Sequence, residues 1–137
     1  MSFAASFPDR LTIDGVGLET RWLGPPPQEA PTLVLLHEGL GCAGMWGRFP
    51  ERLVDATGCG VFVYSRAGYG RSDGITPPRP LTYMHDEAIR GLPPLLDRIG
   101  LRRAILVGHS DGGSIALLYS AAGAAAFSRV TPVSKGL

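Results

Sequence analysis

The stretch that decides the fold is RAILVGHSDGG, residues 103–113. Its apolar start, Arg103–Val107, predicts a buried strand, and the Ala-rich segment Ser114–Ala125 predicts a helix. Between them, Gly108–Gly112 matches the pattern G-x-S-x-G, which is typical of a sharp strand-to-helix turn that presents a nucleophilic serine. The sequence therefore indicates Ser110 as a candidate catalytic nucleophile.

Two further expectations follow from the sharpness of this turn. A strand and a helix that come this close leave no room for side chains two positions before and two positions after the serine, so both positions are glycine. The backbone N–H of Asp111, at the start of the helix, should point toward the oxyanion that develops when Ser110 attacks a carbonyl group. The alternative is a glycine-rich turn that binds a phosphate or no ligand.

Outward from this turn, apolar runs alternate with amphipathic segments. Strands are expected at 11–13, 16–22, 32–36, 60–64 and 103–107, and helices at 45–57, 85–99 and 114–125. The dipeptide Asp14-Gly15 is typical of a two-residue hairpin turn, and the strands at 32–36 and 60–64 are apolar throughout, as in strands covered on both faces. This alternation predicts an α/β fold with a doubly wound, mostly parallel sheet and helices on both faces.

Glycine and proline indicate where the first two helices should end or bend. Gly58 is expected to cap the first helix, and Gly100 to end the second. Pro93 and Pro94 should kink the second helix, because a proline has no N–H to donate to the carbonyl one turn earlier.

The composition fits one globular domain over residues 1–137, with 45% hydrophobic and 18% charged residues. A formal net charge of +1 and the lack of any Lys/Arg run give no reason to expect a nucleic-acid partner. The N-terminus lacks the pattern of a secretion signal, and no window reaches the roughly 18 apolar residues of a membrane span. A cytoplasmic protein without a membrane partner, cofactor or metal is therefore expected.

Cys42 and Cys59 are the only cysteines. They flank a predicted helix of about 13 residues, so roughly 20 Å should separate them, too far for a disulfide. Both are expected to be reduced, with Cys42 as an alternative nucleophile because it lies just after a glycine-rich loop.

Two more glycine-rich stretches follow predicted parallel strands: HEGLG at His37–Gly41 and YSRAGYGRSD at Tyr64–Asp73. With the Ser110 turn, they stand in the order found in the α/β-hydrolase fold family, and the chain resembles the serine hydrolases and esterases of that family over most of its length. The resemblance implies that the second N–H of an oxyanion hole comes from Gly39 or Leu40.

The chain departs from the family pattern in several places. Glu38 stands where the family usually has glycine, and Ser65 and Ala67 stand where it tends to have an acid and an arginine. The family's catalytic acid and histidine follow the serine in the chain, but after Ser110 this sequence has only the acid Asp111 and no histidine. The resemblance therefore implies the N-terminal half of a hydrolase core, truncated after the elbow helix and lacking the later strands and the lid.

Three histidines and one acid remain as candidate bases. His37 ends the strand expected beside Ser110 and is the tentative base, although a hydrogen-bonded loop histidine is the alternative. His85 is expected to be exposed at the start of a helix and could act across an interface, and Glu38 could orient an imidazole or act as a base itself. Strand alternation predicts that His109 points away from Ser110 into the core.

These observations predict a serine hydrolase that acts on carboxylic esters through a Ser110 acyl-enzyme. Its activity is expected to be weak, because the usual triad partners are absent. The alternative is a non-catalytic, truncated remnant or fragment that folds by self-association. Without later strands, the strand at Arg103–Val107 would be an unpaired sheet edge. A homodimer through that edge and the C-terminal segment is therefore expected.

Overall fold

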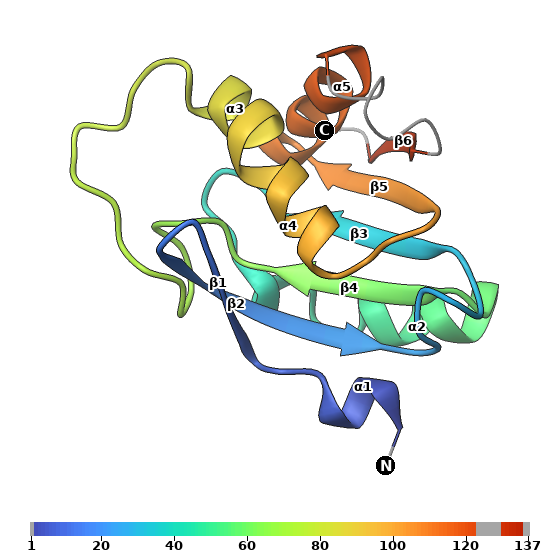
Figure 1. Cartoon of the computed structure of the whole chain (residues 1–137). Helices are drawn as coiled ribbons and strands as arrows, with labels where there is room; N and C mark the ends of the chain where they lie inside the picture. Colours follow the sequence, from blue (N-terminus) through green and yellow to red (C-terminus); the bar gives the residue numbers. More distant parts are fainter. Residues whose placement is uncertain (1, 123–129, 136–137) are drawn as a thin grey trace.

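A computed structural model describes residues 2–122 and 130–135 of the chain, with side chains through residue 121. Within this part, six strands form one sheet in the order β1-β2-β4-β3-β5-β6 (Figure 1). The strands are β1 Arg10–Ile13, β2 Val16–Leu23, β3 Thr32–Leu36, β4 Gly60–Tyr64, β5 Ala104–His109 and β6 Val130–Lys135. The helices are α1 Phe3–Ser6, η1 Ala43–Trp46, α2 Phe49–Thr57, α3 Tyr83–Asp86, η2 Glu87–Gly91, α4 Leu92–Arg98 and α5 Asp111–Ala122.

The sheet is mostly parallel and is covered on both faces. The pairs β3–β4, β3–β5 and β5–β6 are parallel, whereas β2 joins β4 antiparallel. Every residue of β3 and of β4 is buried. Figure 1 shows α4 and α2 on opposite sides of the sheet. The predicted doubly wound α/β fold is confirmed.

Alternate residues of the central strands build two apolar layers. One packs against α4 and α5 and includes Val34, Leu36, Phe62, Tyr64 and Leu106. The other packs against η1 and α2 and includes Leu33, Leu35, Val61, Val63 and Val107. Burial of each large apolar side chain stabilises the fold by about 1.5–3 kcal/mol.

The N-terminal hairpin forms as predicted. Asp14 and Gly15 both have positive φ angles, 50° and 81°, which matches the twist of a two-residue hairpin turn. The short helix α1, which precedes the hairpin, was not expected from the sequence. Its Phe3 ring packs edge-on against Trp22 of β2, with 5.1 Å between the ring centroids.

The first predicted helix is divided in two. A short 3₁₀ turn, η1, ends at Gly47, which has a φ of 57°, and α2 begins at Phe49 with Pro50 in its first turn. Gly58 caps α2 in the left-handed conformation, with a φ of 69°, and its N–H donates to the carbonyl of Val54 at 2.8 Å. The predicted cap is confirmed.

The second predicted helix starts earlier and bends before its prolines. It begins at Tyr83, and the wider π-helical turn η2 separates α3 from α4. Pro93 and Pro94 then lie in the first turn of α4, where a missing N–H costs least. The helix is thus irregular just before these prolines, at the π turn, where the sequence predicted a kink at the prolines themselves.

The prediction that the strand before Ser110 forms a sheet edge is wrong for this structure. β5 pairs in parallel with β6, from Ala104 opposite Val130 to His109 opposite Lys135. Pro132 does not prevent this, because a proline is tolerated in an edge strand, and among the described strands β6 is paired on one side only. The predicted end of the preceding helix, Ala125, lies outside the described residues.

Cys42 and Cys59 are both free, as expected. Among the helices that the structure describes, none is both long and apolar enough to span a membrane.

Candidate active site

The candidate nucleophile Ser110 lies in a strained turn between β5 and α5. Its φ angle is 55°, in the left-handed region that side chains rarely adopt. A Cβ at Gly108 would lie 2.2 Å from the carbonyl oxygen of Gly112, and a Cβ at Gly112 would lie 1.9 Å from that of Leu36. The backbone packing around Ser110 therefore excludes side chains at both flanking positions, as the G-x-S-x-G pattern predicts.

The HEGLG loop lies next to this turn because β3 and β5 are neighbours. The register places Leu36 opposite Gly108, so the chain leaves both strands at the same edge. A Cβ at Gly39 would lie 2.5 Å from the Asp111 carboxylate, which shows how closely the loop approaches the start of α5. The side chain of Leu40 is 95% exposed. The two segments expected to form an oxyanion hole are thus brought together.

His37 is buried, and both of its ring nitrogens have partners other than Ser110. Nδ1 lies 2.7 Å from the carbonyl oxygen of Glu38 and donates to it, because Nε2 accepts the backbone N–H of Arg66 at 3.0 Å. Burial and the positive charge of Arg66 lower the pKa of His37 from 6.5 to about 4. His37 is therefore a neutral, structural side chain in this arrangement, which corrects its assignment as the base.

His109 does not enter the core, contrary to the prediction from strand alternation. Its Nδ1 lies 3.7 Å from a carboxylate oxygen of Glu38, and both side chains are more than one-third exposed. His109 is the last residue of β5, where the side chain leaves the covered part of the sheet and reaches the rim. His85 on α3 is exposed, as expected.

Arg66 is a central residue of this region that the sequence did not single out. Its guanidinium is buried at 4% exposure and donates to the carbonyl oxygens of His37 at 2.5 Å and of Glu38 at 3.2 Å. These bonds fix the HEGLG loop to the end of β4. An arginine two residues after a buried strand was the available signal, since such a charge must find partners.

The YSRAGYGRSD stretch is anchored on the N-terminal hairpin rather than on Ser110. The Ser65 hydroxyl donates to Glu19 at 2.7 Å and accepts the N–H of Ala43 at 2.8 Å. The carboxylate of Asp73 accepts the N–H of Gly17 at 2.7 Å, and this bond holds the pKa of Asp73 below its usual value. These polar residues therefore have a structural role.

Two tyrosines connect the helical region after β4 to the rest of the site. Tyr83 donates its hydroxyl to the Asp111 carboxylate at 2.6 Å, and this bond raises the pKa of Tyr83. Tyr64 donates to the buried carboxylate of Glu87 at 2.6 Å, and burial raises the pKa of Glu87. The α3–η2 segment is thus bonded both to the start of α5 and to β4.

The Ser110 hydroxyl itself has no hydrogen-bond partner among residues 2–122. No group of three or more His, Cys, Asp or Glu side chains within the described residues could hold a metal ion.

Comparisons with known proteins agree with this architecture. The profile of the α/β-hydrolase fold family matches residues 31–134. Proline iminopeptidase of Lactobacillus helveticus is 32% identical over 91 residues, which cover 66% of this chain and 31% of that protein. A Caulobacter segnis protein named as a carbamate hydrolase, RutD, is 33% identical over 108 residues, which cover 77% of this chain and 38% of the relative. The chain thus spans about a third of the length of these relatives.

A solved structure extends the agreement to the fold. The α/β-hydrolase MGS-M2, from a Medee basin deep-sea metagenome library, superposes with a TM-score of 0.73 at 21% identity. The match covers 88% of this chain and 41% of that one. With the family profile matching about three-quarters of its length, the chain belongs to the α/β-hydrolase fold family.

Proposed function

We propose that the chain is a serine hydrolase in which the Ser110 oxygen attacks the carbonyl carbon of a carboxylic ester. The attack gives a tetrahedral oxyanion, which collapses to a Ser110 acyl-enzyme as the oxygen of the alcohol leaves; the serine proton passes to that oxygen or, where an activated alcohol leaves as its anion, to water. Water then attacks the acyl-enzyme, releasing the carboxylic acid and restoring the serine. The observation that carries the proposal is the left-handed Ser110, with a φ of 55°, at the junction of β5 and α5.

The oxyanion would be stabilised by backbone N–H groups from the two segments that meet here. Asp111 supplies one at the N-terminus of α5, where the unpaired N–H groups of a 12-residue helix favour negative charge. Gly39 or Leu40 supplies the other, which the approach of Gly39 to Asp111 supports. The Asp111 carboxylate itself accepts the Tyr83 hydroxyl at 2.6 Å.

The general base is the weakest part of this site. Both ring nitrogens of His37 are engaged in hydrogen bonds. The remaining candidates for the general base are Glu38, which lies at the rim beside His109, and the exposed His85 of a second copy acting across an interface. A serine hydrolase that lacks triad members retains roughly 10³–10⁴-fold catalysis over water. We therefore propose slow turnover, confined to esters with good leaving groups, because these demand least of a base.

The class of bond is chosen on chemical grounds. The names of the relatives include a peptidase and a carbamate hydrolase, which support hydrolysis but not one substrate. An amide nitrogen must be protonated before it leaves, whereas an activated alcohol leaves unaided. Esters are therefore the substrates that this arrangement can cleave with the least help.

Hydrolysis of p-nitrophenyl acetate tests this proposal. We expect slow release of p-nitrophenol by the 137-residue chain, nearly all of it lost in Ser110→Ala. Cys42→Ala serves as the control, because Cys42 is the alternative nucleophile and is only partly buried. Activity that survives Ser110→Ala but is lost in Cys42→Ala would assign the chemistry to the cysteine.

One observation favours a second possibility, a non-catalytic protein. The Ser110 hydroxyl has no partner within residues 2–122, so no described side chain activates it. In that case the elbow would be retained as a packing feature and the chain would fold by self-association. Equal p-nitrophenol release by the parent chain, Ser110→Ala and Cys42→Ala would support this possibility.

A further inference from the structure

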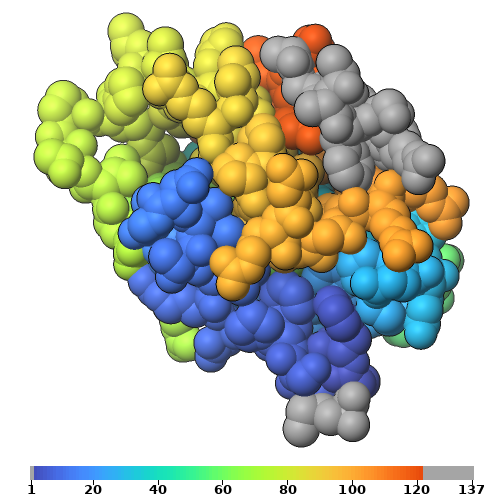
Figure 2. Space-filling model, viewed as in Figure 1, coloured from blue at the N-terminus to red at the C-terminus, as the bar shows by residue number. Residues whose placement is uncertain are grey.

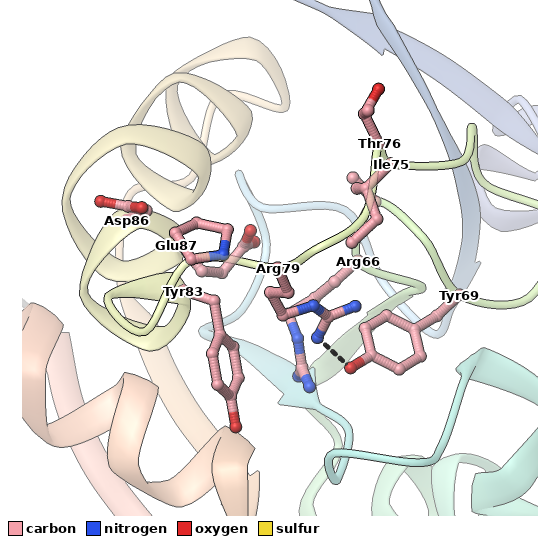
Figure 3. Close-up of a pocket in the computed structure, with 10 residues that line it drawn as sticks. Arg66, Tyr69, Ile75, Thr76, Arg79, Tyr83, Asp86 and Glu87 are labelled. Atoms are coloured by element: carbon pink, nitrogen blue, oxygen red, sulfur yellow. Dashed lines mark hydrogen bonds between the residues drawn. The ribbon is translucent and has the colours of Figure 1, made fainter.

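A pocket of about 210 Å³ lies between the loop that follows β4 and the segment α3–η2. Figure 3 shows the guanidinium of Arg79 in the middle of this pocket, with Tyr69 on one side and Tyr83 on the other. The loop that carries Arg79 forms the projecting yellow-green lobe in Figure 2. The acyl transfer proposed above makes no use of this pocket.

Aromatic rings hold the guanidinium of Arg79. It lies 4.6 Å from the ring centroid of Tyr69 and 5.1 Å from that of Tyr83, and it donates one hydrogen bond to the Tyr69 hydroxyl. Within the described residues Arg79 forms no ion pair. A guanidinium has five N–H donors. Most of the donors of Arg79 are therefore available to a ligand, and the rings restrict its orientation.

The other charged groups that line the pocket are engaged elsewhere. Glu87 accepts the Tyr64 hydroxyl at 2.6 Å, and Asp86 accepts the Thr82 hydroxyl at 3.0 Å. In Figure 3 the Asp86 carboxylate points away from Arg79. Arg66 donates to backbone carbonyls, as described above. The lining thus carries two cations and two carboxylates, and within the described residues Arg79 is the cation whose N–H donors are not taken up by backbone carbonyls.

The pocket adjoins the nucleophile through two of its own walls. Tyr83 donates to the carboxylate of Asp111, the residue directly after Ser110. On the other wall, the Tyr69 ring lies 4.8 Å from the ring of His37, which begins the HEGLG loop. A small molecule held at Arg79 would thus lie beside both segments of the proposed oxyanion hole.

We propose that this pocket binds a carboxylate group of the substrate through Arg79, so that the chain prefers short anionic esters to neutral ones. The planar guanidinium can donate two parallel hydrogen bonds to a carboxylate, a geometry that a neutral group cannot match. A volume of about 210 Å³ admits a carboxylate on a short chain. This preference rests on the proposed ester hydrolysis, whereas carboxylate binding itself does not.

Binding is measured first, by calorimetry on the Ser110→Ala variant, so that no turnover intervenes. We expect glutarate to bind at least tenfold more tightly than glutaramide, its neutral analogue. Arg79→Gln should weaken glutarate binding at least tenfold. The control Arg102→Gln, at an exposed arginine of the α4–β5 connection, should leave it unchanged. Equal binding of glutarate and glutaramide, or no binding of either, would overturn the proposal whatever the Arg79→Gln variant shows.

Selectivity is measured second, on the chain with Ser110 intact. The ratio of kcat/KM for mono-p-nitrophenyl glutarate to that for p-nitrophenyl pentanoate should exceed ten, and Arg79→Gln should reduce it at least tenfold. Thermal unfolding of Arg79→Gln checks that it folds. Glutarate binding without any ester hydrolysis would support the pocket and reject the hydrolase. Hydrolysis without a preference between the two esters would support the hydrolase and reject the role of the pocket in selectivity.

Discussion

The Nε2 atom of His37 accepts the backbone N–H of Arg66 at 3.0 Å, and the Arg66 guanidinium donates back to the carbonyl oxygen of His37 at 2.5 Å. These two hydrogen bonds join the C-terminal ends of β3 and β4, at the end of the sheet where Ser110 lies. The bond to Nε2 needs a neutral imidazole, because a protonated Nε2 could not accept a hydrogen bond.

His37 should therefore make the fold sensitive to acid. The unfolded chain binds a proton on His37 below about pH 6.5, whereas the folded chain binds it only below about pH 4. The free energy of unfolding should thus fall as the pH is lowered from 6.5 to 4, by about 1–3 kcal/mol from this side chain. Urea unfolding at several pH values measures it, and His37→Gln should flatten the dependence. An unchanged slope in His37→Gln would contradict this role.

Gly112→Ala should be among the most destabilising substitutions in the chain. Its Cβ would lie 1.9 Å from the carbonyl oxygen of Leu36, so β3 and α5 would have to separate. We expect a loss of at least about 3 kcal/mol, above the usual range for overpacking because the obstacle is backbone. Gly44→Ala is the control, since no atom lies within 4 Å of its added Cβ. Similar denaturation midpoints for the two variants would contradict the elbow geometry.

The strain at Ser110 should be measurable as a difference between two inactive variants. In Ser110→Ala the folded state still bears the energetic cost of a side chain at positive φ, and glycine removes this cost. Glycine also raises the conformational entropy of the unfolded chain, which offsets part of the gain in stability. On balance, Ser110→Gly should be about 0.5–1 kcal/mol more stable than Ser110→Ala. At the exposed Ser114, inside α5, the same comparison should have the opposite sign, because glycine disfavours helix. The same order at both positions would mean that Ser110 is not strained.

Much of this architecture could be predicted from local sequence. The apolar runs at 32–36 and 60–64 became strands with those bounds, and the glycines flanking Ser110 lie where side chains cannot fit. Both follow from rules that act over a few residues. The roles of His37 and Arg66 could not be predicted, because they depend on which loops meet at the sheet edge. Strand alternation also failed for His109, which it placed in the core. His109 is the last residue of β5, beyond the covered part of the sheet, so its side chain reaches the rim.

Self-association remains a prediction, although its first premise was wrong. β5 is not an edge, but among the described strands β6 is paired on one side only, and Leu117 on α5 is 57% exposed. An open edge beside exposed apolar surface favours pairing with a second copy. Light scattering at micromolar concentration should give the mass of a dimer. A stable monomer would contradict this prediction and would also remove His85 of a second copy as a possible base.

The most direct test of the central claim is labelling with a fluorophosphonate, followed by intact mass and peptide mapping. The proposed hydrolase predicts one adduct per chain, located on Ser110, formed faster on the folded chain than on the chain unfolded in urea, and absent from Ser110→Ala. The folded-state advantage matters, because it separates a serine activated by its surroundings from an ordinary hydroxyl. Labelling at the same rate in the folded and unfolded chains, or an adduct on any other residue, would contradict the assignment of Ser110 as the nucleophile.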